Sequence, residues 1–192
     1  MYSPLELRAL EYIKGAVSSE LSRHLISTRD FALHLNVLHQ LGLDEDRIAL
    51  AALCHDLARE YPVEEMERQL WAKGIDPVSY GFVNPILLHS VLSVEIARDE
   101  IGVDDEEVLD AIRWHSTGRA GMSLLAKLIF VADKVEPSRS YPGVEELRAL
   151  AVADPIGAFP RILGKLINWL IAELKPIDYN SILAYNEAVA GG

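Results

Sequence analysis

The stretch LAALCHDLARE, residues 50–60, leads from small apolar residues directly into an adjacent histidine and aspartate, His55 and Asp56. On a helix, His55 shares a face with three alanines at i−4, i−3 and i+3, so its ring is expected to point into a closely packed interior. Asp56 follows about 100° further round the helix. A buried imidazole beside a buried carboxylate is costly unless both are paired or bound to a cation. The stretch therefore predicts a helical scaffold with a polar site inside it.

The fold class follows from apolar residues that recur with the helical period along most of the 192-residue chain, while strict alternation is scarce. No linker, repeat or low-complexity tract divides the chain, so we expect one all-α, multi-helix domain over residues 1–192. Its core is expected at about 22–175 and a C-terminal helix at about 178–190. Asp44 and Ser123 are typical N-caps, and Asp104 forms a capping-box pattern with Glu107. The predicted helices cover roughly residues 5–20, 27–41, 45–58, 62–73, 86–101, 108–115, 124–136, 144–152, 156–174 and 180–189.

Composition excludes several classes of function. The net charge of −11 argues against a surface for nucleic acid or for anionic membrane lipid. A phosphate substrate remains compatible with it, because bound divalent cations reverse the local field. The single cysteine, Cys54, allows no internal disulfide, and no run of apolar residues approaches the ~20 that a membrane helix needs. The stretch MYSPLELRALEYIKG, residues 1–15, does not resemble a signal peptide. We expect a cytoplasmic protein without nucleic-acid or membrane partners.

Five chemically reactive groups are expected to face inward from separate segments. They are His55, Asp56, His89, His115 and Asp133. Imidazoles and carboxylates suit divalent iron, manganese or zinc, and a shared aspartate can hold two metals about 3.5–4 Å apart. Each residue also has an ordinary interpretation, since a single helical histidine is commonly a packed or surface residue and Asp133 could pair with an arginine. We give His34 and His39 only that ordinary interpretation.

The sequence resembles the HD-domain metal-dependent phosphohydrolases in its His–Asp doublet, two later histidines and distal aspartate. A block from Ala111 to Ala151, AIRWHSTGRAGMSLLAKLIFVADKVEPSRSYPGVEELRALA, is similar to the YqeK-type family of symmetrical diadenosine tetraphosphate hydrolases. The ending SILAYN, Ser181 to Asn186, is similar to that family as well. The resemblance implies an all-helical fold and a centre of two iron ions, with manganese as the alternative.

The resemblance also implies a role for each matching residue. His55, Asp56 and Asp133 would bind the first metal, and Asp56 would bridge to a second metal held by His89 and His115. Asp56, Asp133 and Arg59 would be the catalytic residues, with Arg59 standing where the family has a lysine. Thr117, Gly118, Arg119 and Arg139 would bind substrate phosphates.

One position departs from the family pattern. The family has an additional histidine ligand in an Arg-x-x-His pattern, and a gapless alignment from the doublet places Ile26 at that histidine. His24 lies two residues earlier, about 200° away on a helix, and could substitute only if the local backbone is irregular or shifted. The expectation is a first metal site that lacks one ligand, with His24 as the possible replacement.

The predicted function is symmetrical cleavage of a dinucleoside tetraphosphate to two ADP. The alternatives are a non-catalytic or altered-specificity nucleotide- or metal-binding HD protein, another phosphoesterase, and a helical module without metal. No GxxxxGK[ST] loop is present, so a P-loop enzyme is not expected. Trp114, Tyr141 and Tyr80 are candidates for stacking on a base, and a homodimer is compatible with the sequence.

Overall fold

The computed structural model describes residues 2–191, which form ten α-helices, two 3-10 helices and one π-helix, with no strand among them. The first half contains α1 (Pro4–Ala16), α2 (Ser19–Leu38), α3 (Glu45–Cys54), α4 (Val63–Ala72), η1 (Pro77–Tyr80), η2 (Pro85–Leu87), α5 (Leu88–Ile96) and the π-helix η3 (Ala97–Ile101). The second half contains α6 (Glu106–Trp114), α7 (Leu124–Val135), α8 (Val144–Ala153), α9 (Pro155–Ala172) and α10 (Tyr179–Ala190). The prediction of an all-α fold is confirmed.

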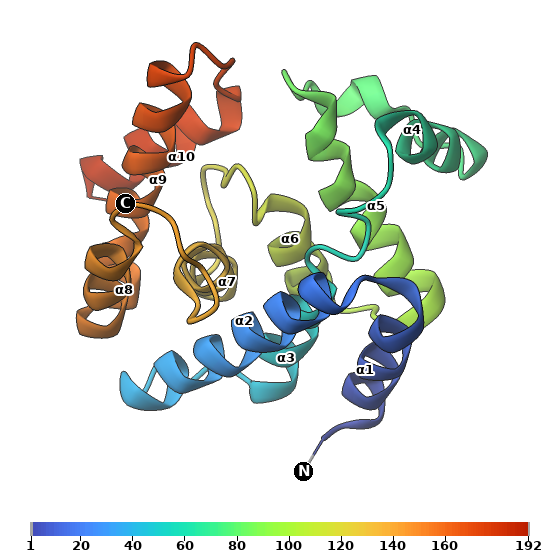
Figure 1. Ribbon diagram of the computed structural model, residues 1–192, viewed down its shortest axis with the longest axis horizontal. Helices are drawn as coiled ribbons and strands as arrows, with labels where there is room; N and C mark the ends of the chain where they lie inside the picture. Colours follow the sequence, from blue (N-terminus) through green and yellow to red (C-terminus); the bar gives the residue numbers. More distant parts are fainter. Residues whose placement is uncertain (1, 192) are drawn as a thin grey trace.

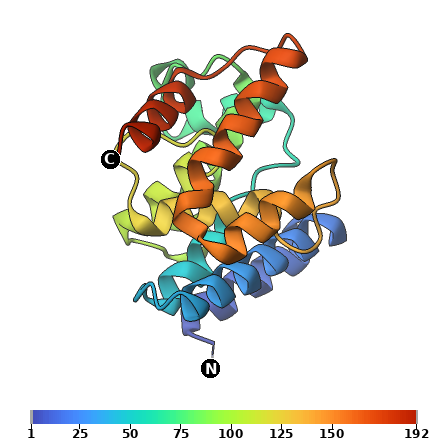
Figure 2. The same ribbon diagram turned by 90° about the vertical axis from the view of Figure 1, so that its left-hand side faces the viewer.

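Helix α7 lies at the centre of the molecule, where it packs against α2, α3, α6, α8 and α9 (Figure 1). Its sequence LLAKLIFVADKV is apolar on nearly every side, and a helix of that kind must be surrounded by others. Figure 2 shows α8 and α9 covering the side of the molecule that lies to the left in Figure 1. Phe130 of α7 meets Phe159 of α9 edge to face, with ring centroids 5.0 Å apart.

The helix ends confirm some predicted caps and correct others. Ser123 accepts a hydrogen bond from the backbone of α7, and Asp44 caps α3, as predicted. The cap of α6 is Asp105 instead of Asp104; its carboxylate accepts from the backbone N–H groups of Glu107 and Val108. Helix α3 ends at Cys54, four residues before the predicted end, so the His–Asp doublet lies on the turn that follows the helix.

The N-terminal helices differ most from the prediction. Helix α1 ends at Ala16, and α2 begins at Ser19, where helices over 5–20 and 27–41 had been expected. The physical reason is Ser18, whose side chain accepts a hydrogen bond from Leu21 N and caps α2. Residues 21–26 are therefore helical, which fixes the direction of each side chain in that segment.

No helix of residues 2–191 combines the length and the apolar character required to cross a membrane. The one cysteine, Cys54, is a buried free thiol, and burial raises its pKa to about 12.

Candidate metal centre

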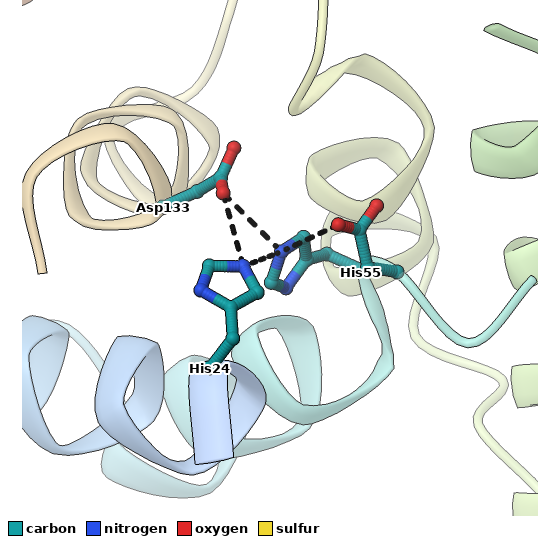
Figure 3. A group of neighbouring side chains, drawn as sticks. His24, His55 and Asp133 are labelled. Atoms are coloured by element: carbon teal, nitrogen blue, oxygen red, sulfur yellow. Dashed lines mark hydrogen bonds and ion pairs between the residues drawn. The ribbon is translucent and has the colours of Figure 1, made fainter. Parts of the chain in front are cut away.

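Four buried residues from three regions of the fold meet at one point, which we call the first cluster: His24, His55, Asp56 and Asp133. Figure 3 shows His24, His55 and Asp133 pointing toward one another from α2, the end of α3 and α7. The two histidine Nε2 atoms are 3.2 Å apart, and Asp133 Oδ1 lies 3.2 Å from His24 Nε2 and 3.6 Å from that of His55. One ligand atom from each of the four residues lies within 4.8 Å of all the others.

The second cluster consists of Asp56, His89 and His115, all buried. Asp56 Oδ1 lies 3.0 Å from Nε2 of both histidines, and those two nitrogens are 3.3 Å apart. Asp56 thus belongs to both clusters, and the adjacency of His55 and Asp56 in the sequence joins them. The structure brings together all five residues that the sequence predicted to face inward.

Three of the histidines are oriented by the same local device. His55, His89 and His115 each direct Nδ1 at the backbone carbonyl oxygen three residues earlier, at 2.7, 2.5 and 2.7 Å. His55 and His115 are the C-cap residues of α3 and α6, where carbonyl groups lack the partner that a continuing helix would provide. A carbonyl oxygen can only accept, so Nδ1 carries the proton and the Nε2 lone pair faces the cluster.

The ring of His24 is held in the same tautomer, but by a side chain instead of a backbone carbonyl group. Its Nδ1 donates to Glu136 Oε1 at 3.0 Å, and Glu136 is completely buried. All four rings therefore present an unprotonated Nε2 in their neutral form, with the opposite nitrogen held by an oxygen acceptor. This is the arrangement in which histidines bind metals.

The buried polar atoms in these clusters fit a bound cation. Asp56 Oδ1 accepts no properly oriented hydrogen bond from any residue between 2 and 191, although two imidazole nitrogens lie 3.0 Å from it. The Oγ atom of Ser116 lies 3.2 Å from His89 Nε2 and 2.9 Å from His115 Nε2. Its hydroxyl has a single proton and can donate to only one of these two nitrogens. Facing lone pairs repel one another in a buried site unless a proton or a metal ion lies among them.

The charge states of the ligands support the same conclusion. Burial lowers the pKa of His115 to about 4 against the opposing effect of Asp56, so this ring is neutral near pH 7. Burial opposes ionisation of Asp133, but Lys134, the neighbouring histidines and Arg139 hold the pKa of that carboxyl well below its usual range. Burial likewise opposes protonation of His24, yet its hydrogen bonds to two carboxylates raise the pKa of the ring. A metal ion at the first cluster would therefore compete with a proton for His24 Nε2.

Two cations border the first cluster at Asp133. Arg139 Nη2 lies 2.6 Å from Asp133 Oδ1 and 3.2 Å from His24 Nε2, and Arg139 Nε donates to the Asp133 carbonyl at 2.9 Å. Lys134 Nζ contacts Asp133 Oδ2 and lies 3.3 Å from the carbonyl oxygen of His115. The sequence allowed Asp133 either to lie among the histidines or to pair with an arginine. In the structure it does both.

The other predicted phosphate-binding residues lie outside the clusters. Thr117 is buried and donates to the Gly118 carbonyl at 2.9 Å, while Ser181 of α10 donates to the Thr117 carbonyl at 2.8 Å. The guanidinium of Arg119 binds Asp110 at 2.9 Å, so the contacts seen direct it toward α6. Arg59 is exposed just beyond the doublet and forms no ion pair within residues 2–191. Their roles toward substrate stay predictions.

The structure corrects the assignment of the histidine missing from the first site. His24 is 7 % exposed and occupies the cluster, whereas Ile26 packs against the edge of the core and lines a surface groove. The backbone at this turn is not irregular: α2 is helical through both residues and directs His24 inward, while Ile26 lies about 200° further round the helix. The first cluster is therefore not short of a histidine.

Three residues near the clusters were not found from the sequence. Lys134 could have been found, because it directly follows Asp133 and adjacent residues commonly share a site. Ser116 likewise follows His115 within the HSTGRAGM motif. Glu136 shares the helical face of Asp133 in the sequence, but its contact with His24 joins positions 112 residues apart and could not be read from that spacing.

Of the aromatic candidates, Trp114 and Tyr80 both pack against Phe82, at centroid distances of 6.1 and 5.9 Å. Tyr141 donates its hydroxyl to the Lys134 carbonyl at 2.8 Å. A groove of about 790 Å³ on the outer side of α2 contains none of the residues of either cluster. The chemistry is therefore assigned from the convergence of ligands and not from the size of a cavity.

Comparison with known proteins places this geometry in a family. Residues 21–138 match the HD domain family. The symmetrical bis(5'-nucleosyl)-tetraphosphatase of Halalkalibacterium halodurans is 37% identical over 180 residues, covering 94% of this chain and 95% of the relative. The protein of the same name from Bacillus subtilis is 36% identical over 183 residues, covering 95% and 97%.

A solved structure gives the same result for the fold. The protein described as a predicted HD superfamily hydrolase involved in NAD metabolism, from Clostridium acetobutylicum, superposes with a TM-score of 0.87 at 31% identity, over 100% of both chains. The match extends beyond the doublet to the whole helical arrangement that brings the two clusters together. The chain belongs to the HD-domain family and, within it, to the YqeK-type group whose members are named symmetrical bis(5'-nucleosyl)-tetraphosphatases.

Proposed function

We propose that this protein is a metal-dependent hydrolase that cleaves diadenosine tetraphosphate symmetrically into two molecules of ADP. The observation that carries the proposal is the pair of buried ligand clusters that share Asp56. The substrate is taken from the names of the two relatives that match almost the whole chain. We further propose that two divalent transition-metal ions, iron or manganese, occupy the clusters of this protein in the cytoplasm.

Divalent cations bound at the two clusters would screen the charge of a polyphosphate and lower the pKa of a coordinated water molecule. His24, His55 and Asp133 would hold the first cation, His89 and His115 the second, and Asp56 both. The two carboxylates place negative charge among imidazoles whose Nε2 atoms face inward, a donor set that suits divalent transition-metal ions. The protein's contribution is thus to fix the spacing of the ligands before substrate arrives.

Positive side chains beside Asp133 suit a polyphosphate that bridges the clusters. Arg139 is 37% exposed at its side chain and Lys134 22%, so both charges lie between the buried cluster and solvent. Phosphoryl transfer depends mainly on positioning and on electrostatic stabilisation of the phosphoryl oxygens. We propose that Arg139 and Lys134 bind substrate oxygens, and we retain Arg59, Thr117, Gly118 and Arg119 as further candidates.

The alternative of a non-catalytic or altered HD protein depended on an incomplete first site. Because His24 stands in the cluster, the structure gives that alternative no particular support. The hydrolase is therefore the function that the geometry supports best.

The test is to supply the purified protein with Mn²⁺, or with Fe²⁺ under anaerobic conditions, and to separate the products of diadenosine tetraphosphate by chromatography. We expect ADP as the only adenine nucleotide formed, and none from a His115→Gln variant. ATP with AMP would contradict symmetrical cleavage, and turnover of NAD⁺ alone would contradict the substrate. Tight metal binding without turnover of either nucleotide would favour the non-catalytic alternative.

A further inference from the structure

His24 is held differently from the other three histidines of the centre. Those three rings donate Nδ1–H to a carbonyl oxygen of their own chain segment, three residues earlier. His24 donates instead to Glu136, which follows α7 and lies 112 residues further along the chain. The orientation of the His24 ring therefore depends on a tertiary contact, whereas the orientations of the other three rings depend on local contacts.

The position of His24 within α2 explains the difference. It lies in the second turn of a helix that continues to Leu38, so the preceding carbonyl groups are engaged in the helix itself. The carbonyl of His24 also accepts a hydrogen bond from Thr28 Oγ1, at 2.9 Å. A histidine placed there needs an acceptor from another element to fix which ring nitrogen carries the proton.

Glu136 is built to be that acceptor. Its side chain is completely buried, and its carboxylate accepts from Ser27 Oγ, from Ser138 N at 2.5 Å and from Ser138 Oγ at 2.6 Å. Arg148 donates to its backbone carbonyl at 3.1 Å, which holds the segment after α7 in place. The carboxylate can only accept, and its donors leave Oε1 directed at the His24 ring.

We propose that Glu136 is a positioning residue for the first cation: it selects the His24 form with Nε2 unprotonated and makes that nitrogen a stronger ligand. The carboxylate–histidine pair acts on the first cluster alone, because the second cluster shares only Asp56 with it. This inference rests on the proposed metal-dependent function, since it concerns how the cation of that function is held.

The substitution Glu136→Gln tests the proposal because the two terminal atoms of a carboxamide differ: its oxygen accepts hydrogen bonds and its nitrogen donates them. The Ser138 backbone N–H requires an oxygen at the position of Oε2, so the amide nitrogen would face His24 Nδ1. A donor there drives the ring to the form protonated on Nε2, which cannot ligate. A carboxamide of the same shape thereby reverses the preference of the histidine without emptying the space.

Metal-free protein is titrated with Mn²⁺ while free Mn²⁺ is followed by its electron paramagnetic resonance. We expect two binding events in the native protein, and in Glu136→Gln a loss of about 10- to 100-fold in affinity for one of them only. The ¹⁵N spectrum of the metal-free variant should show His24 with its proton on Nε2. The matched control is Glu146→Gln, an exposed glutamate of α8, which should bind as the native protein does.

Each other outcome overturns the inference. Unchanged affinity at both sites, or an equal loss at both, would remove the assigned role of Glu136 while leaving the metal-dependent function intact. Failure of the native protein to bind Mn²⁺ would overturn the proposed function as well. If Glu136→Gln does not fold, Ser138→Ala takes its place: it removes one support of Oε1, and it should weaken the same single site, with unchanged binding counting against the proposal.

Discussion

His24 Nε2 and His55 Nε2 lie 3.2 Å apart in a buried site while the opposite nitrogen of each ring donates to an oxygen acceptor. Two neutral imidazoles cannot hydrogen-bond to each other in this arrangement, because both present a lone pair. Arg139 Nη2, 3.2 Å from His24 Nε2, can donate to one of these two lone pairs, and a bound cation would satisfy both. The same relationship recurs at 3.3 Å between His89 and His115.

Bound metal is accordingly expected to stabilise the fold. Mn²⁺ at one hundred times its dissociation constant should add about 2.7 kcal/mol to the free energy of unfolding for each site. In a chain of this size, the stabilisation from one occupied site raises the melting temperature by roughly 5–10 °C. Thermal denaturation with and without Mn²⁺, after removal of metal by a chelator, measures the shift. A melting temperature that does not respond would show that neither cluster binds the ion.

The identity of the additional histidine can be tested by two substitutions in α2. His24→Ala should lose the metal of the first cluster, about one of two equivalents per chain, because it removes a buried ligand. Ile26→His should leave the metal content unchanged, because position 26 faces the edge of the core and a surface groove. Elemental analysis of the purified variants gives the count.

The control for these variants is His34→Ala, which removes an exposed histidine from the same helix and should retain both equivalents. A gain of metal or activity in Ile26→His would mean that the gapless alignment was right and that the observed direction of His24 is not the functional one.

Asp56 is expected to matter more than any single histidine, because it alone belongs to both clusters. Asp56→Asn should lose both metals, and hydrolysis should fall by a factor of at least about 10³, since two-metal catalysis needs both ions. His89→Ala should lose one equivalent and keep the first cluster occupied. Metal analysis of the two variants side by side distinguishes a shared ligand from an ordinary one; equal losses would argue against bridging by Asp56.

Gly118 is expected to resist substitution by alanine. Its backbone has φ +66°, and an added Cβ would lie 3.3 Å from the Ala184 side chain of α10. Gly118→Ala should destabilise the protein by about 2–3 kcal/mol, through backbone strain and a displaced contact, and lower the melting temperature by roughly 4–12 °C.

A matched variant separates the two causes. Gly42 has φ +72° and no atom within 4 Å of an added Cβ, so Gly42→Ala should cost only the strain, about 1–2 kcal/mol. Equal effects at positions 42 and 118 would show that the packing of α10 against the turn after His115 contributes little. A larger effect at 118 would confirm that this turn is held by the C-terminal helix.

The sequence by itself determined the fold class and the five inward-facing groups, because both depend on the spacing of residues that are close together in the chain. Helical periodicity is a property of neighbouring residues, and the placement of His55 beside Asp56 is direct adjacency. Asp44 and Ser123 were found for the same reason, since a cap acts within one turn of its own helix.

Only the tertiary structure decided which residue completes the first cluster and what holds it. A shift of two residues turns a helical side chain by about 200°, so the choice between His24 and Ile26 depends on where α2 begins and how it packs on α7. The contact of Glu136 with His24 joins α2 to the residue that follows α7, 112 positions further along the chain. Such convergence is set by the packing of whole helices, which no local pattern in the sequence records.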